Sequence, residues 1–500
     1  MKRPGTVSSA VFIIVRRLLI ALAVACVLLL IPDRESRVPV GANQQPFAWN
    51  RDAFWKSLEA QFTEARATGC SSLTPRISAS ASAIQDALRT MESNRLSPAD
   101  PLWARLETNL FHLAPLVAAC PDGLPNYVQL VTRLRKGVKR QSEQWNMNAP
   151  DAREKIYRLL YGSRAALEEV LLQSPSNAAP TLVAGTDEPS RTPSTSVFDV
   201  TLHSGDILVS RGGAPTSALI SRGNDYPGNF SHIALLHVDE KTHAVSIIEA
   251  HIERGVVVST LEAYLADKKL RVMVLRLRTD LPQVVADPLL PHKAASAALH
   301  EVKSHHIPYD FAMDYRDHAK QFCSEVASAA YEPLGIRLWM GISHLSSRGL
   351  ISWLSAFGVK HFETQEPSDL EYDPQLRVVA EWRNPETLLQ DHADNAVIDV
   401  MLEDADAGER LRYDWYLLPV ARSLKTYSLV LNLFGGAGPV PEGMSATAAL
   451  RNQRFARNHQ AIRDKTLALA ARFQREHGYN APYWELVMLA RQAKMEIAAD

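Results

Sequence analysis

One cysteine of this 500-residue chain is placed where it could act as a nucleophile. Cys323 lies in the stretch QFCSE, residues 321–325, which is typical of the start of a helix. At a helix start, backbone N–H groups and the helix dipole favour a thiolate over a thiol and can also bind an oxyanion. The alternative is a structural thiol, because a lone cysteine usually behaves as a small buried hydrophobic residue.

Two polar residues inside apolar, strand-like runs could complete a catalytic triad with this thiol. His232 lies at the start of the run HIALL, and Glu249 lies inside the run VSIIEA. If the two strands are adjacent, Glu249 can fix the tautomer of His232, which can then take the proton from Cys323. The alternatives are a hydrogen-bonded histidine at a strand end and an edge carboxylate that faces water.

Metal and cofactor chemistry find no support in the residue spacing. The histidines of the HEVKSH stretch, His300 and His305, are five residues apart, so they do not share one face of a helix as zinc ligands would. No pair of cysteines has zinc-ligand spacing. Acyl transfer to a thiol needs no cofactor. The sequence therefore predicts neither a metal nor a cofactor.

Composition limits the class of protein. Lys and Arg total 54 and Asp and Glu total 55, so the formal net charge is -1 and we expect no nucleic-acid partner. With 46% hydrophobic and 22% charged residues, the bulk of the chain has ordinary globular composition. The length predicts two or three folded units, and any membrane segment must be local.

The first 50 residues are predicted to hold a cytoplasmic tail and a membrane anchor. Residues 18–31 carry no charge, and residues 11–15 extend the apolar run to about 20 residues, so a signal-peptide core and a membrane span are both possible. Small-residue cleavage motifs lie inside the run or far beyond it, which favours an uncleaved anchor. The basic residues before it predict a single-pass protein of the bacterial inner membrane with its domains on the periplasmic side.

An oxidising compartment changes the interpretation of the other cysteines. Cys26 lies in the apolar segment, which leaves three cysteines outside it. Cys70 and Cys120 lie at turn-like ends of helical patterns in one N-terminal region. We therefore predict a disulfide between Cys70 and Cys120, with Cys323 unpaired.

Composition divides the rest of the chain into four parts. Residues 51–172 have helical periodicity, and residues 173–197, rich in Pro, Ser, Thr and Ala, are predicted to be a linker. Residues 198–386 combine short β-like runs, turn signals and later helices, and residues 387–500 are again mainly helical. The predicted class is α+β, with a small antiparallel sheet flanked by two mainly helical regions.

The central region resembles a known enzyme family in five sequence blocks. These are GDIL (205–208), NFSHIAL (229–235), IEA (248–250), PYDF (308–311) and FCSEV (322–326). They are similar to blocks of the permuted papain-like amidases of the YiiX/YaeF type. This family belongs to the NlpC-type cysteine hydrolase superfamily, to which lecithin:retinol acyltransferase is also related. The permuted order is matched here, because the histidine and the carboxylate precede the cysteine.

The resemblance spans roughly residues 202–382 and implies a permuted papain-like domain. It implies Cys323 as the nucleophile, His232 as the base and Glu249 as the residue that orients the base. It also implies that Tyr309 lines the substrate cleft, with a packed tyrosine as the alternative.

Three functions are compatible with these residues. The preferred one is a membrane-anchored cysteine hydrolase that cleaves amide bonds through a thioester acyl-enzyme, with cell-wall peptide as the substrate. The same triad could serve an acyltransferase or lipid deacylase acting on lipid amides or esters. The third function is a non-catalytic envelope scaffold whose helical regions bind partner proteins.

Overall fold

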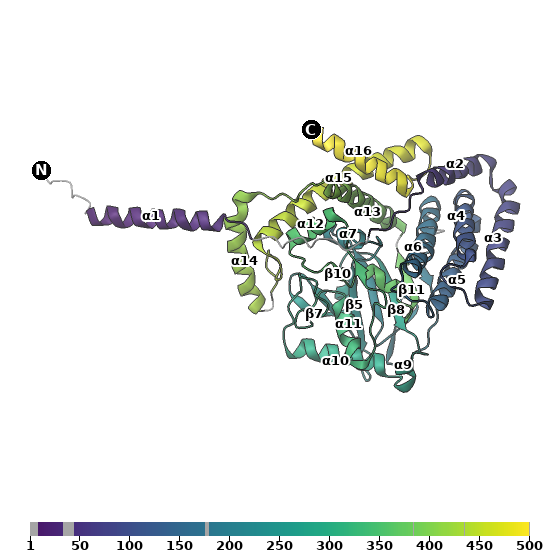
Figure 1. Ribbon diagram of the computed structural model, residues 1–500, viewed down its shortest axis with the longest axis horizontal. Helices are drawn as coiled ribbons and strands as arrows, with labels where there is room; N and C mark the ends of the chain where they lie inside the picture. Colours follow the sequence, from purple (N-terminus) through teal and green to yellow (C-terminus); the bar gives the residue numbers. More distant parts are fainter. Residues whose placement is uncertain (1–8, 34–44, 176–179, 384, 435, 500) are drawn as a thin grey trace.

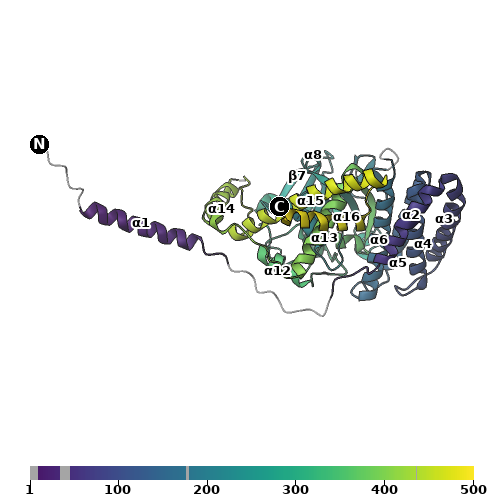
Figure 2. The ribbon, with the colours of Figure 1, turned by 90° about the horizontal axis from the view of Figure 1, so that it is seen from above.

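The computed structural model describes residues 9–33, 45–175, 180–383, 385–434 and 436–499. One long helix, α1 (Ser9–Leu29), projects from a body formed by the remaining elements, and the N-terminal helical bundle lies at the opposite end of that body (Figures 1 and 2). The α+β class predicted from the sequence is confirmed.

The N-terminal bundle consists of five helices around an apolar core. The helices are α2 (Asp52–Thr68), α3 (Cys70–Ser93), α4 (Pro101–Ala119), α5 (Leu124–Ser142) and α6 (Pro150–Gln173). Apolar side chains at helical spacing, such as Trp103, Leu106 and Leu110 of α4, are almost completely buried against the neighbouring helices.

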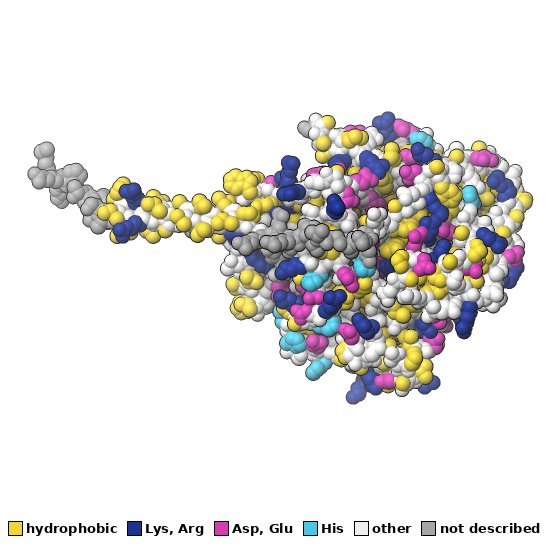
Figure 3. Space-filling view, in the orientation of Figure 1, with side chains coloured by type: hydrophobic (Ala, Val, Ile, Leu, Met, Phe, Trp, Pro, Cys, Tyr) yellow, Lys and Arg dark blue, Asp and Glu magenta, His cyan; other side chains and the backbone are white. Residues whose placement is uncertain are grey.

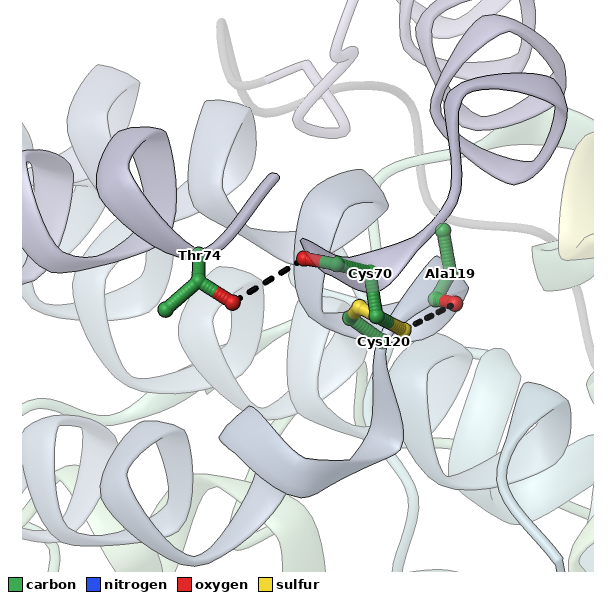
Figure 4. The surroundings of a disulfide bond; sticks show 4 residues. All are labelled: Cys70, Thr74, Ala119 and Cys120. Carbon is green, nitrogen blue, oxygen red and sulfur yellow. Dashed lines mark hydrogen bonds between the residues drawn. A yellow bond between two sulfur atoms is a disulfide. The ribbon is translucent and has the colours of Figure 1, made fainter. Parts of the chain in front are cut away.

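A disulfide joins two helix ends of this bundle. Cys70 begins α3 and Cys120 follows the last residue of α4, and their Cα atoms are 5.3 Å apart (Figure 4). This separation is ordinary for a disulfide. The bond closes a loop with a sequence separation of 50 residues.

The central domain is built on a seven-stranded antiparallel sheet with the strand order β1-β11-β8-β4-β5-β6-β7. Its strands are β1 (Leu182–Ala184), β4 (Ile207–Gly212), β5 (His232–Val238), β6 (Val245–His251), β7 (Gly255–Thr260), β8 (Lys269–Leu277) and β11 (Leu376–Arg383). Two further antiparallel pairs lie outside this sheet. They are β2 (Ser194–Val197) with β3 (Val200–His203), and β9 (Ser343–His344) with β10 (Glu363–Thr364).

The structure differs from the prediction of a linker over residues 173–197. Strand β1 pairs with β11 at the sheet edge, and the Gly185 N–H donates to the Val379 carbonyl at 2.7 Å. Strand β2 forms a hairpin with β3. Strands of three and four residues show almost no hydrophobic alternation. The partner of β1 is also about 200 residues away in the chain, so its pairing leaves no local sequence signal.

Both faces of the sheet are covered. On β5, Ile233 and Leu235 pack in one cluster with α10 (Leu290–Ser304) and α11 (Glu325–Tyr331). The alternate residues Ala234 and Leu236 pack in another cluster, with β3 and α8 (Leu261–Ala266). The apolar run of β5 therefore follows from burial on both faces.

Helices after the sheet pack beside it and against the bundle. They are α12 (Arg348–Phe357), α13 (Pro385–Asp406), α14 (Leu418–Leu433), α15 (Ala446–His477) and α16 (Tyr483–Ala499); the short helices α7 (Pro215–Arg222) and α9 (Pro282–Ala286) precede them in the chain. Helix α13 contacts α6 of the bundle and α7 of the central domain, and it also packs against α12, α15 and α16. The C-terminal helices are thus part of the same body (Figure 2).

A buried charge network joins the three regions. Arg271 of β8 donates to the carboxylates of Glu168 in α6 and Asp391 in α13, the latter at 2.6 Å. His392 also bonds to Glu168, at 3.0 Å. All four side chains are at most 6% exposed. Buried charges need such partners, so this network fixes how the regions dock.

Helix α1 is long and apolar enough to cross a membrane. The window Phe12–Leu29 has a mean hydropathy of 2.6, and none of it is buried within the described body. The same properties fit a signal sequence, because the helix lies near the N-terminus.

Candidate active site

Cys323 is held at the N-terminal end of α11 by local hydrogen bonds. The Phe322 N–H donates to the Glu325 carboxylate at 3.0 Å, and the Glu325 N–H donates to the Phe322 carbonyl at 3.1 Å. This reciprocal pair resembles a capping box and fixes the turn on which Cys323 lies. Helix α11 packs against β5, which carries His232.

The Cys323 sulfur lies against the main chain of strand β5. Its Sγ is 3.9 Å from the Ser231 carbonyl oxygen, and the backbone N–H of Ile233 also bonds to the sulfur. The residue is 6% exposed. Burial raises the pKa of the Cys323 thiol to about 12, so the group is a neutral thiol at neutral pH in this arrangement.

His232 and Glu249 form a direct pair across strands β5 and β6. His232 Nε2 is 2.8 Å from Glu249 Oε2, and the strand register aligns Ala234 with Glu249. Burial lowers the pKa of His232 and outweighs the opposing bond to Glu249, so the ring is neutral at pH 7. An ionised carboxylate only accepts hydrogen bonds, so the ring proton resides on Nε2 and Nδ1 carries the lone pair.

Glu249 has two further partners that the sequence reasoning missed. Its Oε1 lies 3.1 Å from His251 Nε2 and accepts a 2.6 Å hydrogen bond from the Ser259 hydroxyl. Burial favours the neutral carboxyl, but the bonds from His232 and His251 prevail, and the pKa of Glu249 lies well below its usual range. His251 could have been found, because it lies two residues after Glu249 on the same strand face. Ser259 could not, because its approach depends on strand register.

The structure joins two of the three predicted triad residues directly. Within the described residues, Cys323 Sγ makes no hydrogen bond to the His232 ring, and its contacts are with the main chain on either side of His232. The fold therefore brings Cys323 into contact with Ser231, which lies 92 positions earlier in the chain and directly precedes His232.

Tyr309 lies near the predicted nucleophile. The side chain is half-buried and its ring packs against Phe311, with centroids 5.0 Å apart. Burial raises the pKa of Tyr309 well above its usual range, and the neighbouring Cys323 sulfur adds to this shift. Its phenol therefore stays protonated and can donate a hydrogen bond.

The main cavity among the described residues lies away from the predicted triad. A cavity of about 660 Å³ lies between the bundle and the C-terminal helices, where Trp55 and Trp484 line it, but no triad residue does. In the described part of the chain, no group of three or more His, Cys, Asp or Glu residues is arranged to hold a metal ion.

Comparison with known proteins agrees with the resemblance seen in the sequence. The profile of the family described as "Permuted papain-like amidase enzyme, YaeF/YiiX, C92 family" matches residues 201–380. The chain is also similar to the crystal structure of metalloprotein yiiX from Escherichia coli O157:H7 (DUF1105). The identity is 20% over 36% of this chain and 97% of that chain, with a TM-score of 0.28. No curated protein matches. The family model therefore matches residues 201–380, the region in which the five sequence blocks predicted this family.

Proposed function

We propose that this chain is a membrane-anchored cysteine hydrolase that cleaves an amide bond through a thioester acyl-enzyme. The observation that carries the proposal is the 2.8 Å bond between His232 Nε2 and Glu249, which leaves Nδ1 free to act as a base. The Cys323 sulfur lies against the main chain on either side of His232. The family match over residues 201–380 supports a papain-like hydrolase at the general level.

In the proposed reaction, His232 Nδ1 takes the thiol proton while Cys323 Sγ attacks the carbonyl carbon of the amide. Glu249 stabilises the imidazolium that forms, because its carboxylate stays ionised. The imidazolium then gives its proton to the departing amine as the C–N bond breaks. A water molecule, activated by the same ring, hydrolyses the thioester and restores the thiol.

The neutral state of both groups favours general-base catalysis over a preformed ion pair. Burial raises the pKa of the Cys323 thiol and lowers that of the His232 ring. Proton transfer is then coupled to attack, so reactivity should follow the fraction of His232 that is unprotonated.

The anchor and the position of its basic residues lead to the proposed substrate. Helix α1 remains attached as a single membrane span, and Lys2, Arg3, Arg16 and Arg17 keep the N-terminus in the cytoplasm of a bacterium. The hydrolase domain is then periplasmic, where the abundant amides are those of cell-wall peptides. We assign these peptides as the substrate class.

Alkylation of Cys323 by iodoacetamide between pH 5 and 9 tests the triad without a known substrate. In the wild-type chain, the labelling rate should rise through a midpoint below about 6.5 and then level off, because His232 has a lowered pKa. In His232→Ala the rise of the labelling rate below pH 6.5 should be absent, and labelling should rise only at alkaline pH. His243→Ala, an exposed histidine after β5, is the control and should behave as wild type.

A single alkaline profile shared by the wild-type chain and His232→Ala would contradict the proposal. Cys323 would then be a structural thiol.

A further inference from the structure

Helix α14 presents an exposed apolar face that the described chain does not cover. The face, called here the α14 face, consists of Tyr416, Val420, Leu424, Tyr427, Val430 and Phe434. Tyr416 lies in the turn just before α14, and Phe434 directly follows its last residue. The six residues recur at intervals of three or four, so they line one side of the helix and its two ends. Their exposed fractions range from 39% for Leu424 to 84% for Phe434, far above those of core residues.

The opposite side of α14 is firmly attached to the body. Leu418 and Ala421 are buried in a small apolar cluster with α15. The Ser428 hydroxyl accepts a 3.0 Å bond from the Val440 N–H, and the Lys425 ammonium donates to the Pro441 carbonyl at 2.8 Å. The α14 face is therefore a fixed part of the surface and not the side of a loose segment.

The α14 face lies where α1 meets the body. The Arg422 guanidinium in α14 donates to the carbonyls of Leu28, at 3.0 Å, and Ile31 at the C-terminal end of α1. The Asp33 carboxylate accepts from Arg422 at 3.3 Å and from the Thr447 hydroxyl of α15 at 2.8 Å. In Figure 1, α14 runs across the direction of α1, at the edge of the body from which α1 leaves. A helix in this position lies along the surface of any bilayer that α1 crosses.

The charge and the residue types of α14 and of the segment before it also suit a bilayer surface. Helix α14 contains no acidic residue, and Arg410 and Arg412 just before it are exposed. Trp415 is 62% exposed at the N-terminal end of the helix, and indole rings prefer the boundary between headgroups and acyl chains. Figure 3 shows hydrophobic side chains gathered at the edge of the body next to the apolar α1.

We propose that the α14 face and Trp415 insert into the outer leaflet of the bilayer that holds α1, and that α14 is an interfacial helix. The apolar side chains would reach roughly 5–10 Å into the boundary of headgroups and acyl chains, while nearby Arg side chains attract anionic lipids. This inference rests on the anchor in the proposed function. It gives the protein a second, orienting contact with the membrane.

The contact is coupled to the active site through one short segment after α14. Glu442 pairs with His306 at 2.7 Å, and Gly443 packs against Phe311, so closely that a Cβ atom there would come within 2.4 Å of the ring. Phe311 contacts Tyr309, the tyrosine beside Cys323. The bilayer contact therefore holds the Tyr309 side of the site in a set orientation to the membrane.

Tryptophan fluorescence in nanodiscs tests this orientation on the full chain. All nine tryptophans lie in the described residues, and Trp415 alone is strongly exposed. Brominated phosphatidylglycerol and phosphatidylethanolamine should quench part of the emission, and this quenched part should fall to background in Trp415→Phe. Trp382→Phe is the matched control, because Trp382 packs against Phe198 and not near α14; it should retain the quenched part.

A second variant tests the face itself. Val430→Ser combined with Phe434→Ser removes two exposed apolar side chains of the α14 face and should reduce the quenching of Trp415 at least twofold, with unchanged circular dichroism. Unquenched Trp415 in the wild-type chain would overturn the proposal. A dimer seen by mass photometry in that case would assign the face to a second copy.

Extraction of membranes with alkaline carbonate tests the α1 anchor independently of the α14 proposal. A chain that carbonate releases lacks the α1 anchor, and that part of the proposed function then fails. The quenching of Trp415 decides the α14 proposal in either case.

Discussion

The 2.8 Å hydrogen bond between His232 Nε2 and Glu249 Oε2 determines which ring nitrogen can accept a proton. Neighbouring strands β5 and β6 supply the two residues, so their separation is fixed by the sheet. His251 and Ser259 hold the other carboxylate oxygen. Both carboxylate oxygens of Glu249 therefore have partners in the sheet.

Glu249→Gln should lower kcat by roughly 10²–10⁴-fold, because a neutral amide neither stabilises the imidazolium nor enforces one tautomer. The measurement is kcat on an amide substrate, with circular dichroism to confirm the fold. Exposed Glu262→Gln in α8 is the matched control. Activity within about threefold of wild type would remove Glu249 from the mechanism.

Cys323→Ala should abolish amide cleavage and cost less than about 1.5 kcal/mol of stability, since a small buried side chain is replaced by one of similar size. Mass spectrometry of the wild-type chain incubated with cell-wall peptides should find an acyl adduct on Cys323 that hydroxylamine removes. The control variant Cys26→Ser should retain amide cleavage and the acyl adduct on Cys323. Cleavage by the Cys323→Ala chain would show that another group attacks the substrate.

The buried histidine of α15, His459, should make the free energy of unfolding depend on pH. His459 is fully buried, and burial lowers its pKa from 6.5 to about 4. Between these values the unfolded chain binds a proton that the folded chain does not. The contribution of neutral His459 to the free energy of unfolding should therefore be complete above pH 6.5. It should fall by about 3 kcal/mol as the pH drops to 4.

Urea unfolding at pH 7.5 and 4.5 measures this loss. His459→Gln should show a smaller loss between the two values than wild type, whereas exposed His112→Gln should not. Equal losses in His459→Gln and wild type would assign the pH dependence to other groups.

The disulfide should stabilise the bundle without affecting catalysis. A closed loop of about 50 residues restricts the unfolded chain by about 4 kcal/mol in the chain-entropy estimate. Cys70→Ser with Cys120→Ser should lower the Tm of the bundle and leave the iodoacetamide profile of Cys323 unchanged. An unchanged Tm with and without reductant would contradict this prediction.

Much of the site was readable from the sequence because its signals are local. Histidine and glutamate stand out inside apolar runs, and the five blocks predicted the family whose model matches residues 201–380. The polar partner Ser259 and the edge strand β1 are set by strand register, which no single segment encodes. The α14 face was also missed, because a helix with apolar residues on two sides appears buried until its packing is known.

The buried pairing of Arg271 with Glu168 and Asp391 bears on how this protein can be divided. A shortened chain that begins after Gln173 would lose Glu168, and one that ends before α13 would lose Asp391. Each cut leaves the buried Arg271 guanidinium without one of its carboxylate partners. Breaking a buried pair in this way lowers the free energy of unfolding by roughly 3–5 kcal/mol. The central domain is therefore expected to need both flanking helical regions in order to fold, so the three regions should be expressed as one chain.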